Sequence, residues 1–432
     1  MAAPSETLPP LVPTGKIPPQ PWMTAPEIRS VMSALTAKGA EVRFVGGCVR
    51  DAIRKIETHD IDIATPTPPE EVMALLEGRD IKVIPTGLKH GTVTVVSGIW
   101  NMEITTLRID LQTDGRRARV AFTDDWIADA ARRDFTINTL SATLDGDVYD
   151  PFSGMDDLAT GHVRFVGNAQ DRIEEDILRL LRFFRMHAIY SKFGPDKTAL
   201  AACRNLAPRL TELSGERVRT ELFRILMAPE PADTLTIMRG EKVLEPILPE
   251  ASNIGRLRTL TFLETRAINV ESVVPDVLRR FAAVLELEDS MVEDLATRMK
   301  LSNKQAQRLT TLMAVDPPTT PEVNSWARRQ RLRRLGPDMV RDLVLLAWAE
   351  ELATEPRRSS KRTAEWIELL EEVDAWGPVK FPLKGKDVLD QGLEPGAKVG
   401  EILRNVENWW ESEDYSPDRE ACLKYLKDLM AK

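Results

Sequence analysis

A short stretch near the N-terminus, Phe44-Val45-Gly46-Gly47-Cys48-Val49-Arg50-Asp51, decides the fold of the first third of the chain. It has the pattern of a strand that runs into two glycines and then into a helix. Glycine lets the backbone come close to a ligand, the N–H groups at the start of a helix attract anions, and Arg50 adds a cation. The stretch therefore predicts a phosphate-binding turn at Gly46 and Gly47. A Gly-Gly turn also commonly connects a strand to a helix without binding a ligand. The turn alone therefore favours this structural alternative and does not decide the function.

Two aspartates follow this turn in Asp60-Ile61-Asp62-Ile63. Residues i and i+2 of a strand point to the same face, so we expect Asp60 and Asp62 to present their carboxylates side by side, with the isoleucines facing the core. Adjacent anions repel each other, and two hard oxygen ligands beside a phosphate-binding turn predict a catalytic Mg²⁺ site. The structural alternative is a solvent-facing edge strand with alternating charge. The glycines upstream favour the catalytic interpretation.

A third carboxylate would complete such a site, and Glu103 is the candidate. It lies on the strand predicted at Trp100–Leu107. An ordinary half-exposed strand explains this glutamate equally well.

The chain divides into an α/β part and a helical part. From Ala25 to about Asp157, short β-rich runs alternate with helical ones, which predicts an α/β head with a small mixed sheet. The expected strands are Glu41–Val45, Ile61–Ala64, Ile81–Pro85, Gly91–Val96 and Trp100–Leu107. After Arg172 apolar residues recur at helical spacing, so the rest is expected to be all-α. The expected helices are Arg172–Tyr190, Gly215–Met227, Ser290–Met299, Lys304–Ala314 and Met339–Thr354.

Charge limits the ways in which this protein can bind nucleic acid. The net charge of −9 argues against a protein that coats nucleic acid through a bulk positive field, so any RNA contact must be local. Between Arg298 and Arg334, nine Lys or Arg stand against two acids. This basic patch suits RNA phosphates, and a solvated helix face is the plainer alternative.

Cysteine usage and hydropathy indicate the compartment. The three cysteines are far apart, so we expect neither a zinc site nor a disulfide framework, and Cys48 is expected to be a small apolar filler. No apolar run approaches the roughly 18 residues of a membrane span. Met1–Pro26 holds only Lys16 among basic residues, so no targeting segment is expected there. We therefore expect a cytoplasmic protein with no membrane contact.

Several motifs, in order, resemble those of the class II tRNA nucleotidyltransferases and bacterial poly(A) polymerases, members of the polymerase-beta superfamily. Gly46–Asp51 with Asp60–Asp62 is similar to their first motif. Arg132-Arg133-Asp134-Phe135-Thr136-Ile137-Asn138 resembles their RRDFT-x-N signature, departing just after it with Thr139-Leu140 where small residues are usual. The resemblance implies that Gly46, Gly47 and Arg50 hold a triphosphate and that Arg132, Arg133, Asp134 and Asn138 order the nucleotide.

Two later motifs continue the resemblance. Asp150-Pro151-Phe152, with Gly154 and Asp156-Asp157-Leu158, resembles the third motif, which closes the catalytic head. Ser214-Gly215-Glu216-Arg217-Val218, with Glu221, looks like the last motif, to which the family gives a structural role. Ser214 is also a plausible helix N-cap by propensity alone.

The segment Glu175-Asp176-Ile177-Leu178-Arg179 resembles the family's amino-acid template. The resemblance implies that Asp176 and Arg179 bind the edge of the incoming base and select C or A. A carboxylate and a guanidinium supply the acceptors and donors that this requires. It also implies phosphate, ribose or positioning contacts for Arg182 and Arg185. We expect Asp176 and Arg179 on one face of a single helix, with Arg185 on the opposite side. A plain surface ion pair is the alternative.

The segment Ile109–Ala131 resembles the flexible loop that complete CCA-adding enzymes possess and CC-adding relatives have shortened. Its presence favours enzymes that add CCA, or A, over those that add only CC. A variable surface loop is the structural alternative.

The resemblance implies template-independent addition of CCA to the 3′ end of tRNA from CTP and ATP, with Mg²⁺ as cofactor and no protein partner. A poly(A) polymerase of the same family is the first alternative. A non-catalytic tRNA-binding protein is the second, and the intact aspartate pair speaks against it. We expect a flexible tail (1–25), a catalytic head (26–158), a neck with the base-selecting helix (159–230), a helical body (231–335) and a helical, tRNA-binding tail (336–432).

Overall fold

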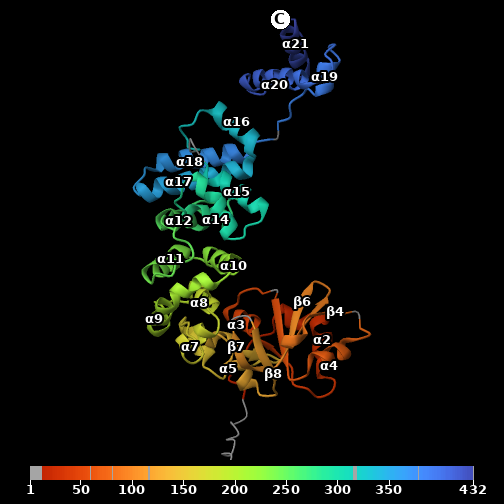
Figure 1. Cartoon of the computed structure of the whole chain (residues 1–432), viewed down its shortest axis with the longest axis vertical. Helices are drawn as coiled ribbons and strands as arrows, with labels where there is room; N and C mark the ends of the chain where they lie inside the picture. The colour runs from red at the N-terminus through yellow and green to blue at the C-terminus, as the bar shows by residue number, and fades with distance from the viewer. Residues whose placement is uncertain are drawn as a thin grey trace, which may run out of the picture. The chain divides into compact units, whose positions relative to one another are not determined.

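The computed structural model describes residues 12–58, 60–79, 81–114, 117–314, 319–377 and 379–431 (Figure 1). The chain separates into two compact units, residues 1–251 and 252–432. The first unit holds every strand in the described ranges, and the described part of the second is helical. The boundaries expected at 158, 230 and 335 stay predictions.

The first unit is built on one eight-stranded sheet with the strand order β1-β10-β9-β2-β3-β6-β5-β4. Among its described strands only the interior pair β3·β6 runs parallel, so the sheet is mixed, as expected. The strands are β1 (Gly15–Lys16), β2 (Arg43–Val45), β3 (Asp60–Thr65), β4 (Lys82–Gly87), β5 (Thr92–Ser97), β6 (Trp100–Thr106), β9 (Ser141–Ala142) and β10 (Asp147–Tyr149). All five expected strands are confirmed, with ends that shift by one or two residues.

Short helices cover this sheet and form the core of the head with it. The helix α3 (Gly47–Arg54) packs on β2 and β3, α4 (Pro69–Leu76) packs on β5, and α2 (Pro26–Thr36) packs on α4. Phe44, Ile61 and Ile63 are buried in this core. Alternation along β3 therefore places its isoleucines inside and leaves its aspartates on the other face.

The N-terminal segment differs from the expected flexible tail over residues 15–24. Strand β1 pairs with β10, and α1 (Pro21–Thr24) buries Trp22, whose ring meets Phe44 edge-on at 4.7 Å. Proline suggested disorder, but Pro21 and Pro26 stand in the first turns of α1 and α2, where a missing N–H costs nothing. Residues 1–11 lie outside the described ranges.

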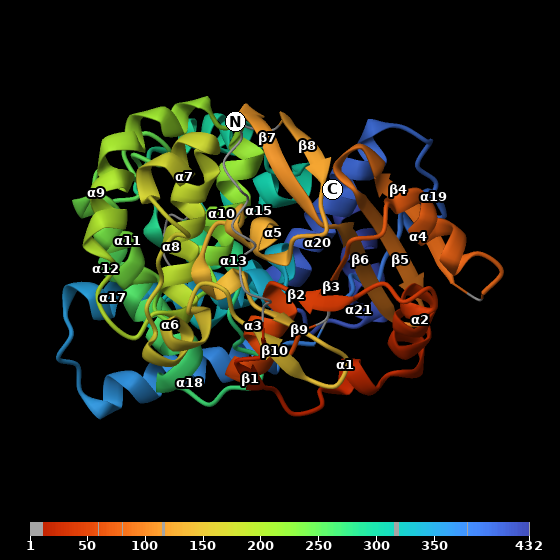
Figure 2. The same ribbon diagram turned by 90° about the horizontal axis from the view of Figure 1, so that it is seen from below.

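The segment expected to be a flexible loop is largely regular. Strands β7 (Arg108–Asp114) and β8 (Arg117–Phe122) pair as a separate antiparallel ribbon, and α5 (Trp126–Ala131) follows (Figure 2). Gly115 and Arg116 lie outside the described residues. The segment is thus present as a β-hairpin followed by a helix.

The third motif closes the head by fixing one turn. Asp150 accepts hydrogen bonds from the N–H groups of Gly154 at 2.8 Å and Met155 at 2.9 Å, at the start of α6 (Gly154–Thr160). A side chain on Gly154 would clash with the backbone oxygen of Thr136, so this position requires glycine. The closing role expected of this motif therefore has a structural basis.

Five helices follow the head within the first unit. They are α7 (Ala169–Glu175), α8 (Leu178–Tyr190), α9 (Lys197–Leu206), α10 (Gly215–Leu226) and α11 (Pro231–Gly240). Helix α8 packs against α7, α10 and α11, and its Phe183 stacks on Phe165 with ring centroids 5.7 Å apart. Phe165 in turn contacts Phe135 at 4.7 Å, which joins the second motif to the helical part. Ser214 occupies the expected N-cap position of α10, but its side chain makes no capping hydrogen bond there.

The single helix expected at Arg172–Tyr190 is wrong, because the structure breaks it into α7 and α8. Asp176 has an extended backbone, with φ −153° and ψ 108°. Its side chain accepts a hydrogen bond from the N–H of Leu178 at 3.1 Å and so starts the second helix. Aspartate favours such local bonds over the helix interior, which explains the break.

Every regular element in the described residues of the second unit is a helix. Its α-helices are α12 (Ile254–Phe262), α13 (Val277–Val284), α14 (Val292–Arg298), α15 (Asn303–Met313), α16 (Ser325–Leu335), α17 (Pro337–Thr354), α18 (Ser360–Asp374), α19 (Gly385–Leu389), α20 (Ala397–Ser412) and α21 (Arg419–Met430). The three helices expected here are confirmed. In the described parts of the chain, no helix combines the length and the apolar character that crossing a membrane requires.

The basic patch of the second unit is partly neutralised by its own acids. Arg308 pairs with Asp276 and Asp342, and Arg328 pairs with Glu372 at 2.7 Å. Arg333 pairs with two glutamates of α20. These arginines hold helices together, so fewer cations than expected remain to bind RNA phosphates.

Candidate active site

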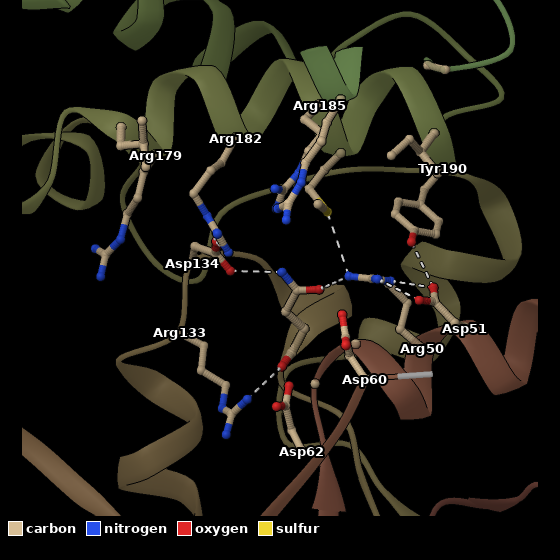
Figure 3. Close-up of a pocket in the computed structure, with 18 of the residues that line it drawn as sticks. Arg50, Asp51, Asp60, Asp62, Arg133, Asp134, Arg179, Arg182, Arg185 and Tyr190 are labelled. Atoms are coloured by element: carbon tan, nitrogen blue, oxygen red, sulfur yellow. Dashed lines mark hydrogen bonds and ion pairs between the residues drawn. The ribbon is translucent and has the colours of Figure 1, made fainter. Parts of the chain in front are cut away.

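One cavity of about 950 Å³ in the first unit gathers the expected site residues (Figure 3). Every one of them except Glu103 lines it: Gly46, Gly47, Arg50, Asp60, Asp62, Arg132, Arg133, Asp134, Asn138, Asp176, Arg179, Arg182 and Arg185. The head supplies the glycines and acids, and α8 and α10 supply the opposite wall.

The glycine turn has the predicted local structure. Gly46 has φ +69° and ψ −122°, a conformation that disfavours other residues, and α3 begins at Gly47. A Cβ on Gly46 would lie 3.1 Å from Nη1 of Arg133. The turn thus leaves room for the arginine of the second motif to approach the backbone.

The acidic pair faces the cavity. Figure 3 shows the side chains of Asp60 and Asp62 directed to the same space, while Ile61 and Ile63 are buried. In the described residues, no side chain or backbone group donates a hydrogen bond to either carboxylate. Burial raises the pKa of Asp62 to about 6, the charges of Glu103 and Asp60 add to this, and Arg133 and Arg50 oppose it. Two unpaired, mutually repelling carboxylates are the donor set that a hard divalent cation neutralises.

Glu103 lies directly opposite Asp62 in the parallel register of β3 and β6. Its side chain is exposed and does not line the cavity. Among the residues that the structure describes, no three acidic, histidine or cysteine side chains are arranged to hold a metal ion. The third-ligand role of Glu103 therefore stays a prediction.

Arg50 is enclosed by protein groups. Its Nε and Nη2 donate to the carboxylate of Asp51, both at 2.9 Å, and its Nη1 donates to Oδ1 of Asn138 at 2.6 Å. The guanidinium also stacks over the ring of Tyr190, 4.3 Å from its centroid. Arg50 therefore joins α3 to the second motif and to α8, and its expected contact with a triphosphate stays a prediction.

A chain of hydrogen bonds that includes Arg50 runs along the cavity from Tyr190 to Arg182. The hydroxyl of Tyr190 donates to Oδ1 of Asp51 at 2.7 Å. At the other end, Asn138 donates to Oδ1 of Asp134 at 2.9 Å, and Nε of Arg182 donates to Oδ2 of Asp134 at 2.6 Å. Tyr190 and Arg182 both belong to α8, so the chain fixes this helix to the head at two points. Sequence reasoning assigned no role to Tyr190, which carries no signal beyond its residue type, or to Asp51, although Asp51 belongs to the first motif.

Arg132 and Arg133 share one acid. Nη2 of Arg132 lies 2.7 Å from Oδ1 of Asp129, and Nη2 of Arg133 lies 3.2 Å from Oδ2. Burial tends to raise the pKa of Asp129, but the charges of Arg133 and Arg132 outweigh it and hold that pKa below the usual range. Asp129, on α5, thus positions both arginines at the cavity wall. Sequence reasoning missed it because it stands outside the motif.

The expected template pair does not share a helix face. The carboxylate of Asp176 accepts from Nη2 of Arg217 at 2.8 and 3.0 Å. Arg179 pairs with Glu175 and donates to the carbonyl oxygen of Arg172 at 3.0 Å. The single-helix placement and the plain ion pair are therefore both wrong. Both side chains nevertheless line the cavity.

The arginines of α8 lie on one broad face. Because α8 starts at Leu178, Arg179, Arg182 and Arg185 are successively about 60° apart around it. Figure 3 shows all three directed to the cavity, so the expectation that Arg185 lies on the opposite side is wrong. The expectation counted Asp176 as part of the helix, whereas the backbone of Asp176 is extended and α8 begins at Leu178.

Arg185 is supported by the last motif. It forms a buried ion pair with Glu221 of α10, with Nη1 and Oε2 separated by 3.0 Å. Burial lowers the pKa of Arg185 to about 10, Glu221 opposes this, and the charges of Arg182 and Arg224 add to the lowering. The pair fixes α8 against α10, which fits the structural role that the resemblance implies for this motif.

A glycine turn, an unpaired acidic pair on the next strand and a facing wall of arginines define the class of protein as a nucleotidyltransferase. Residues 42–164 match the family model for the poly(A) polymerase head domain. Residues 192–254 match the model described as the probable RNA and SrmB binding site of polymerase A.

Known proteins are similar over nearly the whole chain. The human mitochondrial CCA tRNA nucleotidyltransferase 1 is 31% identical over 404 residues, which cover 93% of this chain and 89% of that protein. The CCA-adding enzyme of Streptococcus gordonii is 30% identical, covering 93% and 97%. The structure of the Bacillus stearothermophilus CCA-adding enzyme in complex with CTP superposes with a TM-score of 0.74 at 25% identity, covering 95% and 98%. The chain belongs to the tRNA nucleotidyltransferase and poly(A) polymerase family.

Proposed function

We propose that this protein adds CCA to the 3′ end of tRNA without a nucleic-acid template. The RNA 3′-hydroxyl loses its proton to solvent as its oxygen bonds to the α-phosphorus of CTP or ATP, the bond from that phosphorus to the β-phosphate oxygen breaks, and pyrophosphate leaves. The observation that carries this proposal is that Asp60 and Asp62, unpaired among the described residues, line the same cavity as Asp176 and Arg179. The names of the human and streptococcal relatives support the choice of CCA addition.

Mg²⁺ fits the acidic pair because both carboxylates are hard oxygen ligands without a protein donor in the described residues. An ion held there would supply Lewis-acid chemistry, which would polarise phosphate oxygens and make the 3′-hydroxyl easier to deprotonate. Asp60 and Asp62 would hold it, with Glu103 beside them. The glycine turn and the arginines of the second motif bind the triphosphate.

Asp176 selects the base by its acceptor character. Cytosine and adenine present an exocyclic amino group as a donor, whereas uracil and guanine present an oxygen at the equivalent position. A carboxylate has about four acceptor sites, and Asp176 gives some of them to Leu178 and Arg217. The remaining acceptor sites of Asp176 accept a hydrogen bond from an amino group and repel an oxygen. Arg179 supplies donors to the ring acceptors of the same edge.

The cytoplasm is the compartment that we propose. All three cysteines are free and buried, and burial raises the pKa of Cys48 to about 12, which suits an apolar filler in a reducing environment. The human relative carries "mitochondrial" in its name. Fractionation of cells that express the tagged protein tests the assignment, and recovery in an organelle would overturn it.

Incubation of a tRNA transcript that ends at the discriminator base tests the reaction itself. We expect CTP alone to add two nucleotides, ATP alone to add none, and both together to add three and stop. Long A tails on unrelated RNA would instead indicate poly(A) polymerase activity. Incorporation of no nucleotide by the folded protein would favour a non-catalytic RNA-binding protein.

A further inference from the structure

The arginines that line the cavity differ in whether they form an ion pair with an acid. Eight arginines line it, and seven of them form ion pairs with acids described above. The eighth, Arg224 of α10, is exposed, and its side chain forms no hydrogen bond or ion pair with any residue in the described ranges. Together with Asp60 and Asp62, it is a charged cavity residue whose side chain forms no ion pair within the described ranges.

Arg224 shares a face of α10 with the residues that support the base-selecting region. Arg217, Glu221 and Arg224 stand at positions i, i+4 and i+7, which fall on one side of a helix. Arg217 holds Asp176, and Glu221 holds Arg185. Arg224 is therefore two turns, about 10.5 Å along the axis, beyond the residue that holds the base-selecting carboxylate.

The wall beside Arg224 is apolar. Met227, Ala228 and Pro229 follow directly after α10 and line this end of the cavity, and Met227 is 43% exposed. The charge of Arg224 also acts on Arg185 and adds to the lowering of its pKa. This end of the cavity thus combines an uncompensated positive charge with apolar surface, the combination that suits a phosphate next to a sugar and base.

We propose that Arg224 binds a backbone phosphate of the RNA strand whose 3′-hydroxyl reacts, and that Met227 and Pro229 contact its last nucleotides. This inference rests on the proposed function and names the residues that hold its second substrate. The triphosphate is assigned to the head, at Gly46 and Gly47, and the base to Asp176. The cavity wall beyond Arg217, which includes Arg224 and Met227, is therefore assigned to the RNA strand.

Arg224→Ala tests the proposal, with a tRNA transcript that ends in CC and with ATP as the probes. We expect the KM for this RNA to rise about tenfold, the change that loss of one charged hydrogen bond brings, while the KM for ATP stays unchanged. The slope of log Kd for the RNA against log salt concentration should fall by about 0.7, because one phosphate contact of a single strand is lost. Arg224→Lys should restore most of the affinity.

Arg209→Ala is the matched control, because it removes one exposed arginine that pairs with Glu212 outside the cavity. It should change neither KM nor the salt slope. An increased KM for ATP in Arg224→Ala, with unchanged RNA affinity, would assign Arg224 to the triphosphate and overturn the proposal, as would no change in either. Wild-type protein that extends no RNA would instead overturn the proposed function, so the two failures are distinguishable.

Discussion

The cavity of the first unit and the buried ion cluster of the second use charged residues in opposite ways. In the second unit, Glu264 accepts from Arg279 and Arg280, and Asp342 accepts from Arg279 and Arg308, so each acid is neutralised. In the cavity, Asp60 and Asp62 have no such donors among the described residues, and burial raises the pKa of Asp62. An unpaired buried charge destabilises a fold. The comparison teaches that the acids of this cluster support structure, whereas Asp60 and Asp62 are left without donors where the metal is expected to bind.

The largest effect expected from this comparison is on activity. Asp60→Ala should lower incorporation of CMP by at least about a hundredfold, because a metal ligand is lost, while circular dichroism and the unfolding midpoint stay close to wild type. Incorporation is measured with CTP and a tRNA transcript that ends at the discriminator base. Asp171→Ala, which removes an exposed acid of α7, is the control and should be fully active. Full activity of Asp60→Ala would remove the metal assignment.

The same change of charge in the buried cluster should act on stability instead. Glu264→Gln leaves Arg279 and Arg280 without their shared carboxylate. We expect the free energy of unfolding of the second unit to fall by about 3–5 kcal/mol, the cost of breaking a buried pair. Urea denaturation measures the change. A variant as stable as wild type would show that this cluster is not structural.

A smaller effect is expected on base selection. Asp176→Ala removes the acceptor for the exocyclic amino group, and discrimination of CTP against UTP should fall by about 1–3 kcal/mol, or roughly 5-fold to 140-fold. Ratios of kcat/KM for the two nucleotides measure it. Retained discrimination would take the base-selecting role away from Asp176.

The smallest effect concerns the stability of the metal-free protein. The pKa of Asp62 is about 6 in the folded state, above the ordinary aspartate value. The folded protein therefore binds the proton more tightly, and this group lowers stability as the pH rises from about 4 to about 6. Asp62→Asn should thus stabilise the metal-free protein at pH 8 by about 1 kcal/mol, with little gain at pH 4. Denaturation in EDTA at both pH values measures this, and equal stability at pH 8 would contradict it.

Local patterns were sufficient to predict the parts of the site that lie close together in sequence. The glycine turn and the two aspartates of β3 follow from spacing and alternation alone. The break at Asp176 could not be predicted from periodicity, because the apolar pattern continues through it while one side-chain hydrogen bond interrupts the helix.

Contacts between segments that are distant in sequence could not be predicted. The pairing of Tyr190 with Asp51 joins residues 139 positions apart, and that of Arg217 with Asp176 joins residues 41 positions apart. No local pattern carries such information. The prediction of a flexible N-terminal tail was wrong for the same reason. The prolines there start helices only because Trp22 is buried in the core of the head.

The most direct test of the central claim is an experimental structure of the protein with Mg²⁺ and CTP. We predict a metal ion about 2.0–2.1 Å from carboxylate oxygens of Asp60 and Asp62, with the cytosine amino group at Asp176. A nucleotide bound away from these aspartates, or a metal ion that neither of them contacts, would contradict the account.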